Sequence, residues 1–139
     1  MILLDTNVVS EPLKPSPDPL VIEWLDAQSI ETLYISTTTL AEWLTGIRRM
    51  PSGKRRDLFE QAVEQWIESF IASRILPFDE KAAQRHADLS AQAFAIGKPV
   101  GFADCQIAAI ASIHKLAVAT RDEEPFRNLN IPVINPFQP

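Results

Sequence analysis

Four acidic residues of the sequence stand where an apolar element would hold a carboxylate in a fixed position. Asp5 ends a short apolar run at the start of the chain, and Asp122 ends another late in the chain. Glu42 falls one turn into a predicted helix, and Asp104 falls in the first turn of a very apolar one. Clustered carboxylates repel one another, so gathering these four in one crevice requires a compensating cation.

Such a set of acids suits a hard divalent cation, because Mg²⁺ and Mn²⁺ prefer oxygen ligands and retain several waters. An ion of this kind can generate hydroxide from water and stabilise a displacement at phosphorus without any histidine. Each acid also has a structural interpretation. Asp5 could cap a helix, Glu42 could be a solvated surface acid, and Asp104 could interact with a helix dipole. The combination of the four favours the metal site over these separate explanations.

The other reactive residue types suggest no competing centre. His86 and His114 fall on apolar helix faces, where we expect packed histidines rather than metal ligands. Cys105 is the single cysteine, predicted to be a small buried residue and consistent with a reducing compartment. The chain has four glycines and no glycine-rich phosphate loop.

Apolar runs alternate with helical segments, as is typical of a parallel sheet covered by helices. We predict strands at residues 1–4, 32–36, 74–79, 116–120 and 131–134, with the last at an edge because it contains a proline. We predict helices at residues 21–28, 37–50, 54–72, 79–96 and 102–114, and a stiff proline-rich loop at residues 12–19. Ligands bind beyond the carboxyl ends of such strands, where the strand order reverses. If the first and fourth strands are neighbours there, Asp5 and Asp122 face one crevice.

Length and charge set further bounds. The 139 residues suit a single domain, residues 1–139, with a real hydrophobic core. A net charge of −5 does not favour general attraction to nucleic acid, so a nucleic-acid enzyme of this composition needs a local basic patch or a bound metal. The densest basic cluster, residues 48–56, suits a solvated helix end or a phosphate contact. With neither a membrane-length apolar run nor a signal-peptide pattern, we expect a cytoplasmic protein that makes no membrane contact.

Four segments carry a family resemblance in their order along the chain. They read Leu-Leu-Asp-Thr-Asn at residues 3–7, Thr-Thr-Leu-Ala-Glu at residues 38–42, Ala-Asp-Cys-Gln-Ile-Ala-Ala at residues 103–109 and Ala-Thr-Arg-Asp at residues 119–122. Together they resemble a PIN-domain protein and are similar to the toxins of VapBC-type toxin–antitoxin pairs, especially the FitB-like branch. Residues 133–137 also resemble that branch, so the resemblance spans essentially the whole chain.

The resemblance implies an α/β fold, a three-layer α/β/α sandwich whose parallel sheet has the strand order 3-2-1-4-5. It implies a Mg²⁺- or Mn²⁺-dependent endoribonuclease that hydrolyses RNA phosphodiesters and leaves a 5′-phosphate. It also implies a small cognate antitoxin and a homodimer. The metal-binding and catalytic set carries over to Asp5, Glu42, Asp104 and Asp122, with Thr6 and Thr120 as supporting residues.

One position departs from the family pattern. Many relatives have asparagine at the position of Asp122 and an aspartate just before the next phenylalanine. Here Pro125 precedes Phe126. We therefore place the fourth acid at Asp122, and a contribution from Glu123 or Glu124 stays open.

A phosphatase or a receiver-like phosphoacceptor domain could use the same kind of sheet, but two positions disfavour it. A phosphoaspartate phosphatase needs a second acid two residues after Asp5, where Asn7 stands, and a receiver domain needs a lysine after a late strand, whereas Lys98 follows a helix. A non-catalytic PIN-fold binding module is the other alternative. The complete acidic set favours the enzyme over the module.

Overall fold

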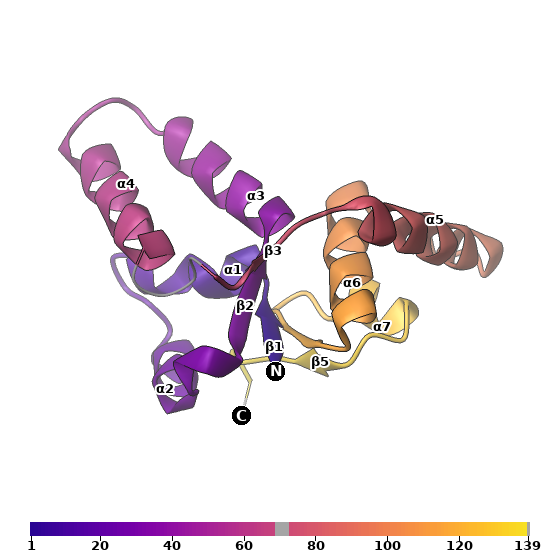
Figure 1. Ribbon diagram of the computed structural model, residues 1–139. Helices are drawn as coiled ribbons and strands as arrows, with labels where there is room; N and C mark the ends of the chain where they lie inside the picture. The colour runs from indigo at the N-terminus through magenta and orange to yellow at the C-terminus, as the bar shows by residue number, and fades with distance from the viewer. Residues whose placement is uncertain (69–72, 139) are drawn as a thin grey trace.

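A sheet of five parallel strands forms the centre of the molecule, with helices on both faces (Figure 1). The computed structural model describes residues 1–68 and 73–138. The strands are β1 (Ile2–Leu4), β2 (Leu33–Ser36), β3 (Ile75–Leu76), β4 (Ala117–Ala119) and β5 (Val133–Ile134). Their order is β3-β2-β1-β4-β5. The predicted α/β/α sandwich and its strand order 3-2-1-4-5 are therefore confirmed.

Helices from the first half of the chain cover one face of the sheet, and those from the second half cover the other (Figure 1). The first group contains α1 (Thr6–Val9), α2 (Pro19–Ala27), α3 (Thr37–Arg48) and α4 (Lys54–Trp66). The second contains α5 (Glu80–Ala95), α6 (Phe102–His114) and α7 (Glu124–Asn128). Two short 3₁₀ helices are η1 (Glu11–Leu13) and η2 (Ile30–Thr32). Among the described residues, no helix is both long and apolar enough to cross a membrane.

The two faces of β1 belong to two different hydrophobic cores. Leu3 packs with the buried residues of α6, whereas Leu4 packs with Val8 and Ile35 on the other face. Both leucines are fully buried, because successive strand residues point to opposite faces and helices cover each face. The strand that ends at Asp5 is therefore held on both sides, which fixes the position of that carboxylate.

Several local predictions were wrong. Leu58, expected on the apolar face of α4, is 61% exposed, and His114, expected to pack, is exposed. The proline-rich loop begins with η1, since Pro12 suits the first turn of a helix. The short helices α1 and α7 were not predicted. Phe70 and Ile71, assigned to the same apolar face as Leu58, lie outside the described residues.

Candidate active site

The carboxyl ends of β1 and β4 meet at the centre of the sheet. Leu4 pairs with Ala119, and the Asp5 amide donates to the Ala119 carbonyl at 2.9 Å. β2 pairs with the other side of β1, so the strand order reverses here. The first and fourth strands are therefore neighbours, as the argument for a shared crevice requires.

Asp5 is a buried carboxylate with every oxygen engaged. The residue is only 6% exposed. Its Oδ1 accepts the Thr6 amide at 2.8 Å, so Asp5 does cap α1. Its Oδ2 accepts the Thr120 hydroxyl at 2.8 Å and the Asn7 amide group at 3.4 Å. The capping role and a place in the site are thus compatible, because each uses a different oxygen.

Asn7 and Thr120 tie the loop after β4 to Asp5. The Thr120 hydroxyl accepts the Asp122 amide at 3.1 Å and Asn7 Nδ2 at 3.3 Å. Asn7 Oδ1 accepts the Arg121 amide at 3.1 Å. Sequence reasoning used Asn7 only for its lack of charge and missed this bridge, because its partners lie more than a hundred residues away. The sequence feature that could have indicated this bridge is an asparagine two residues after the acid that ends the first strand.

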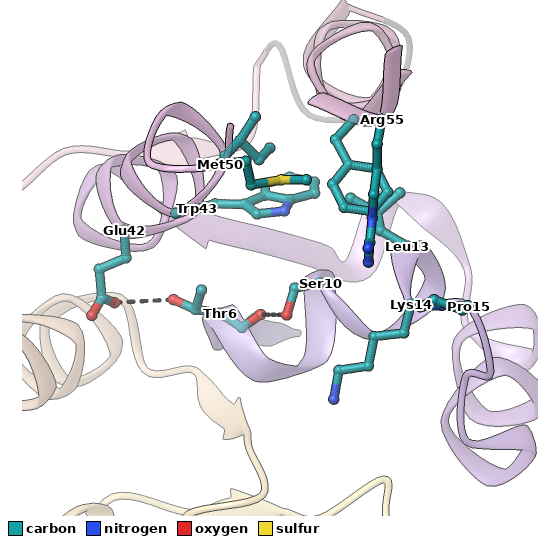
Figure 2. Close-up of a pocket in the computed structure, with 12 residues that line it drawn as sticks. Thr6, Ser10, Leu13, Lys14, Pro15, Glu42, Trp43, Met50 and Arg55 are labelled. Carbon is teal, nitrogen blue, oxygen red and sulfur yellow. Dashed lines mark hydrogen bonds between the residues drawn. The ribbon is translucent and has the colours of Figure 1, made fainter. Parts of the chain in front are cut away.

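Glu42 reaches the crevice from α3. Ser36 caps this helix by accepting the Thr39 amide at 2.9 Å, which places Glu42 on the helix's second turn. The residue is exposed, yet its Oε1 accepts the Thr6 hydroxyl at 3.0 Å (Figure 2). This bond joins α3 to α1 directly beside Asp5.

Asp104 lies in the first turn of α6 and is half-buried. The next residue, Cys105, is buried as predicted, and its thiol lies 3.6 Å from the His86 carbonyl. A bond from the Thr38 hydroxyl to Gln106 Oε1, at 2.8 Å, joins this turn to α3. The elements that carry Glu42 and Asp104 are therefore linked at their amino-terminal ends.

The four carboxylates act on one another electrostatically. Burial raises the pKa of Asp5 and the charges of Glu42 and Asp122 raise it further, against the hydrogen bonds from Thr120 and Thr6. Burial also raises the pKa of Asp104, and the charges of Asp5 and Asp122 add to that effect. The structure thus places Asp5 within electrostatic reach of Glu42, Asp104 and Asp122.

The spacing of these acids bears on metal binding. Within the part of the chain that the structure describes, no three Asp, Glu, His or Cys side chains converge closely enough to hold one ion directly. Mg²⁺ commonly uses one or two carboxylates and keeps several waters, so an all-protein cage is not needed. The donors are all hard oxygens whose charges repel. This donor chemistry fits a hydrated divalent cation.

The two acids left open beside Asp122 differ in their surroundings. Glu123 is bound by Asn135, whose Nδ2 lies 3.0 Å from Oε2, and by Arg127. Glu124 instead lines a cavity of about 240 Å³ together with Asp122. Of the two, Glu124 shares a cavity with Asp122, whereas Glu123 holds the carboxyl-terminal segment through Asn135.

An apolar pocket of about 310 Å³ adjoins the acids (Figure 2). Thr6 and Glu42 line one end, and Lys14 and Arg55 line the other. Trp43 lies between them and is almost fully buried. The acidic crevice therefore continues into an apolar surface with basic side chains at its far end.

Fold and site together define an α/β/α protein with an acidic crevice at the reversal point of a parallel sheet. The PIN domain profile matches residues 2–131, so the chain belongs to the PIN domain family. It is 50% identical over 139 residues to the VapC ribonuclease Y4jK of Sinorhizobium fredii, covering 100% of this chain and 99% of that protein. It is 44% identical over 137 residues to toxin FitB of Neisseria gonorrhoeae, covering 99% of each. The chain is thus a homologue of VapC and FitB toxins.

Solved structures agree with this assignment. The crystal structure of FitAcB from Neisseria gonorrhoeae superposes with a TM-score of 0.96 at 43% identity and covers 100% of both chains. FitAB bound to an IR36 DNA fragment gives a TM-score of 0.96 at 42% identity, covering 100% of this chain and 97% of that one. VapBC2 from Rickettsia felis, at 22% identity, shares the fold with a TM-score of 0.80 and coverage of 97% and 98%.

Proposed function

We propose that the chain is a metal-dependent endoribonuclease and the toxin of a type II toxin–antitoxin pair, acting on RNA in the cytoplasm. The observation that carries this proposal is that the carboxyl ends of β1 and β4, which lead into Asp5 and Asp122, lie side by side, with Glu42 hydrogen-bonded to Thr6 beside them. Its relatives include a protein named a VapC ribonuclease and one named a toxin, each covered over nearly its full length. The reaction is the hydrolysis of an RNA phosphodiester.

The four acids share one part in this proposal. Mg²⁺ or Mn²⁺ would be held among Asp5, Glu42, Asp104 and Asp122, partly through waters that the ion keeps. Such an ion would activate a water and stabilise charge at phosphorus. Two supporting side chains orient the acids. Thr120 orients Asp5 through Oδ2, and Thr6 orients Glu42 through its hydroxyl. Such orienting partners commonly affect metal affinity or activity by about 10–100-fold.

The proposed protein partners are a small cognate antitoxin and a second copy of this chain. One structural neighbour is FitAB bound to a DNA fragment, and another is a DNA-bound VapBC from Salmonella typhimurium. The apolar pocket beside Glu42 offers a surface from which an antitoxin segment could cover the acids. A copurified small protein that lowers cleavage would support this assignment.

Cleavage of RNA by the purified chain tests the proposed activity. With Mg²⁺ or Mn²⁺ we expect cleavage of a mixed RNA substrate, and we expect none in excess EDTA. Asp104→Asn should abolish cleavage, whereas Asp88→Asn, the same change at an exposed site on α5, should leave it intact. Cleavage in excess EDTA contradicts the metal dependence. An intact chain that binds RNA but never cuts it favours the binding-module alternative.

A further inference from the structure

A second buried carboxylate lies six residues after Asp5, outside the acidic set. Glu11, at the start of η1, is only 3% exposed. Its Oε1 accepts the Asp18 amide at 3.0 Å. Its Oε2 lies 2.9 Å from Lys14 Nζ and 3.9 Å from Arg121 Nη2. This carboxylate therefore anchors two cations, one from η1's end and one from the loop after β4.

Arg121 belongs to the crevice through its backbone. It stands between Thr120, which bonds Asp5, and Asp122, and its amide donates to Asn7 at 3.1 Å. Any strand of RNA whose phosphate reaches these acids must pass close to this loop. The side chain of Arg121 is thus attached to the edge of the proposed active site.

The guanidinium of Arg121 is held in place, and it keeps the capacity to donate hydrogen bonds to a ligand. Its carbon lies 3.9 Å from the centroid of the Phe137 ring, a stacking contact that Arg makes well. At 3.9 Å its contact with Glu11 is an ion pair too long for a hydrogen bond. In the described part of the chain, no side-chain hydrogen bond engages this guanidinium, and the side chain is 53% exposed. The guanidinium is therefore partly open to solvent while Phe137 and Glu11 contact it.

Fixed planar donors beside a nuclease crevice suit a phosphate. An arginine fork binds phosphate oxygens with two parallel hydrogen bonds, which a lysine cannot reproduce. Lys14 adds a second, half-exposed cation and lines the same pocket as Thr6 and Glu42. Since the chain carries a net charge of −5, RNA binding depends on local cations of this kind.

We propose that Arg121 and Lys14 bind a backbone phosphate of the RNA next to the phosphate that is cleaved. Glu11 and Phe137 are positioning residues that hold the guanidinium and the ammonium in place. A phosphate contact of this type fixes the register of the strand and carries no base specificity. This inference rests on the proposed ribonuclease function and deepens it.

Salt-dependent binding tests the proposal directly. Fluorescein-labelled single-stranded RNA is titrated with the Asp104→Asn protein in Mg²⁺, which binds without cutting, at several KCl concentrations. Introducing Arg121→Gln into the Asp104→Asn protein should weaken RNA binding by roughly 10-fold, which is the size of effect expected from the loss of one hydrogen bond to a charged group. It should also lower the slope of log Kd against log salt by about 0.7, the value of one single-strand phosphate contact.

Lys115→Gln provides the matched control for charge. Lys115 lies between α6 and β4, at the amino-terminal end of β4 and so away from the carboxyl end that leads into Asp122. It is exposed, and the change removes the same single positive charge. We expect it to leave both Kd and the salt slope as in the parent. If Arg121→Gln and Lys115→Gln show the same Kd and slope, the proposal is overturned.

Steady-state cleavage separates phosphate binding from a merely structural role. In the otherwise unchanged protein, Arg121→Gln should raise KM roughly 10-fold with kcat within about threefold, because the contact is made in the ground state as well. Arg121→Lys should restore the salt slope but not the full affinity. A lower melting temperature with unchanged KM and slope would mean a structural role and would refute the proposal. If the parent cuts no RNA, the proposed function fails, while the binding titrations still decide the role of Arg121.

Discussion

Asp5 and Glu11 are two buried carboxylates on either side of α1, and their surroundings are opposite in charge. They are 6% and 3% exposed. Asp5 is surrounded by hydroxyl and amide donors and by other carboxylates, and burial together with those charges raises its pKa. Burial also opposes ionisation of Glu11, but bonds from Lys14 and the Asp18 amide and the charges of Lys14 and Arg121 outweigh it and lower its pKa.

The difference shows which charge the protein compensates by itself. Glu11 has its cations within the chain, so it can serve the fold and hold Arg121 in place. Asp5 has hydrogen bonds but no compensating cation among the interactions that shift its pKa. A cation bound from solution therefore stabilises the buried charge of Asp5 more than that of Glu11. Burial alone would not have distinguished Glu11, which has its cations within the chain, from Asp5, which has none among these interactions.

The largest expected effect separates the two acids by activity. Asp5→Asn should reduce kcat for RNA cleavage by about 10²–10³-fold, the order seen when a group that stabilises transition-state charge is removed. Glu11→Gln should change kcat by less than about tenfold, because Glu11 is a positioning residue that acts through Arg121 and Lys14. Single-turnover cleavage of a labelled RNA measures both. Equal losses of kcat in the two variants would contradict the claim that Asp5 and Glu11 have different roles.

A smaller effect is expected at Thr120, which is fully buried and bridges Asp5 to the loop of Asp122. Thr120→Val keeps the shape but removes the hydroxyl, and should lower activity by about 10–100-fold. Thr120→Ser keeps the hydroxyl and serves as the matched control. Measured kcat/KM values that fall alike in both variants would assign the effect to packing rather than to the hydrogen bonds.

The smallest effect concerns stability and its dependence on pH. A raised pKa means that folded Asp5 keeps its proton to higher pH than the unfolded chain, so its contribution is complete below the usual 3.8 and is lost as pH rises. Glu11 has a lowered pKa, so its contribution is present above the usual 4.5 and is lost as pH falls. The two acids should therefore drive stability in opposite directions.

Urea unfolding in EDTA measures these contributions. At pH 7, Glu11→Gln should cost about 1–3 kcal/mol, and the loss should shrink below pH 4.5, near the usual pKa of the group. Asp5→Asn should gain stability relative to the parent as pH rises above 3.8. If both variants change with pH in the same direction, the contrast between the two acids is wrong.

Much of the sheet could be predicted from the sequence, as could the positions of Asp5 and Asp122 after β1 and β4, whereas the role of the four acids as a metal site stays a prediction. The apolar run before Asp5 and the one before Asp122 marked strands buried on both faces, and such runs are local signals. That β1 and β4 are neighbours came from the family resemblance, because strand order depends on long-range pairing. The edge position of β5 followed from Pro132, since proline cannot donate to a sheet.

The contacts that orient the acids could not be predicted in the same way. Glu11 pairs with Arg121 and Asn7 bonds Thr120 across more than a hundred residues, and no periodicity encodes such pairs. Leu58 was misplaced because a regular apolar pattern on α4 was extended to a helix edge that faces solvent. The five-residue helix α7 is too short to show a helical period.

Titration of Mn²⁺ into the protein by isothermal calorimetry tests the central claim most directly, because metal binding is measured without RNA. The parent and Glu11→Gln should bind Mn²⁺ alike, whereas Asp5→Asn should lose affinity by about 10-fold or more. The absence of Mn²⁺ binding by the parent with all four acids intact, or equal affinities in the parent and Asp5→Asn, would contradict it.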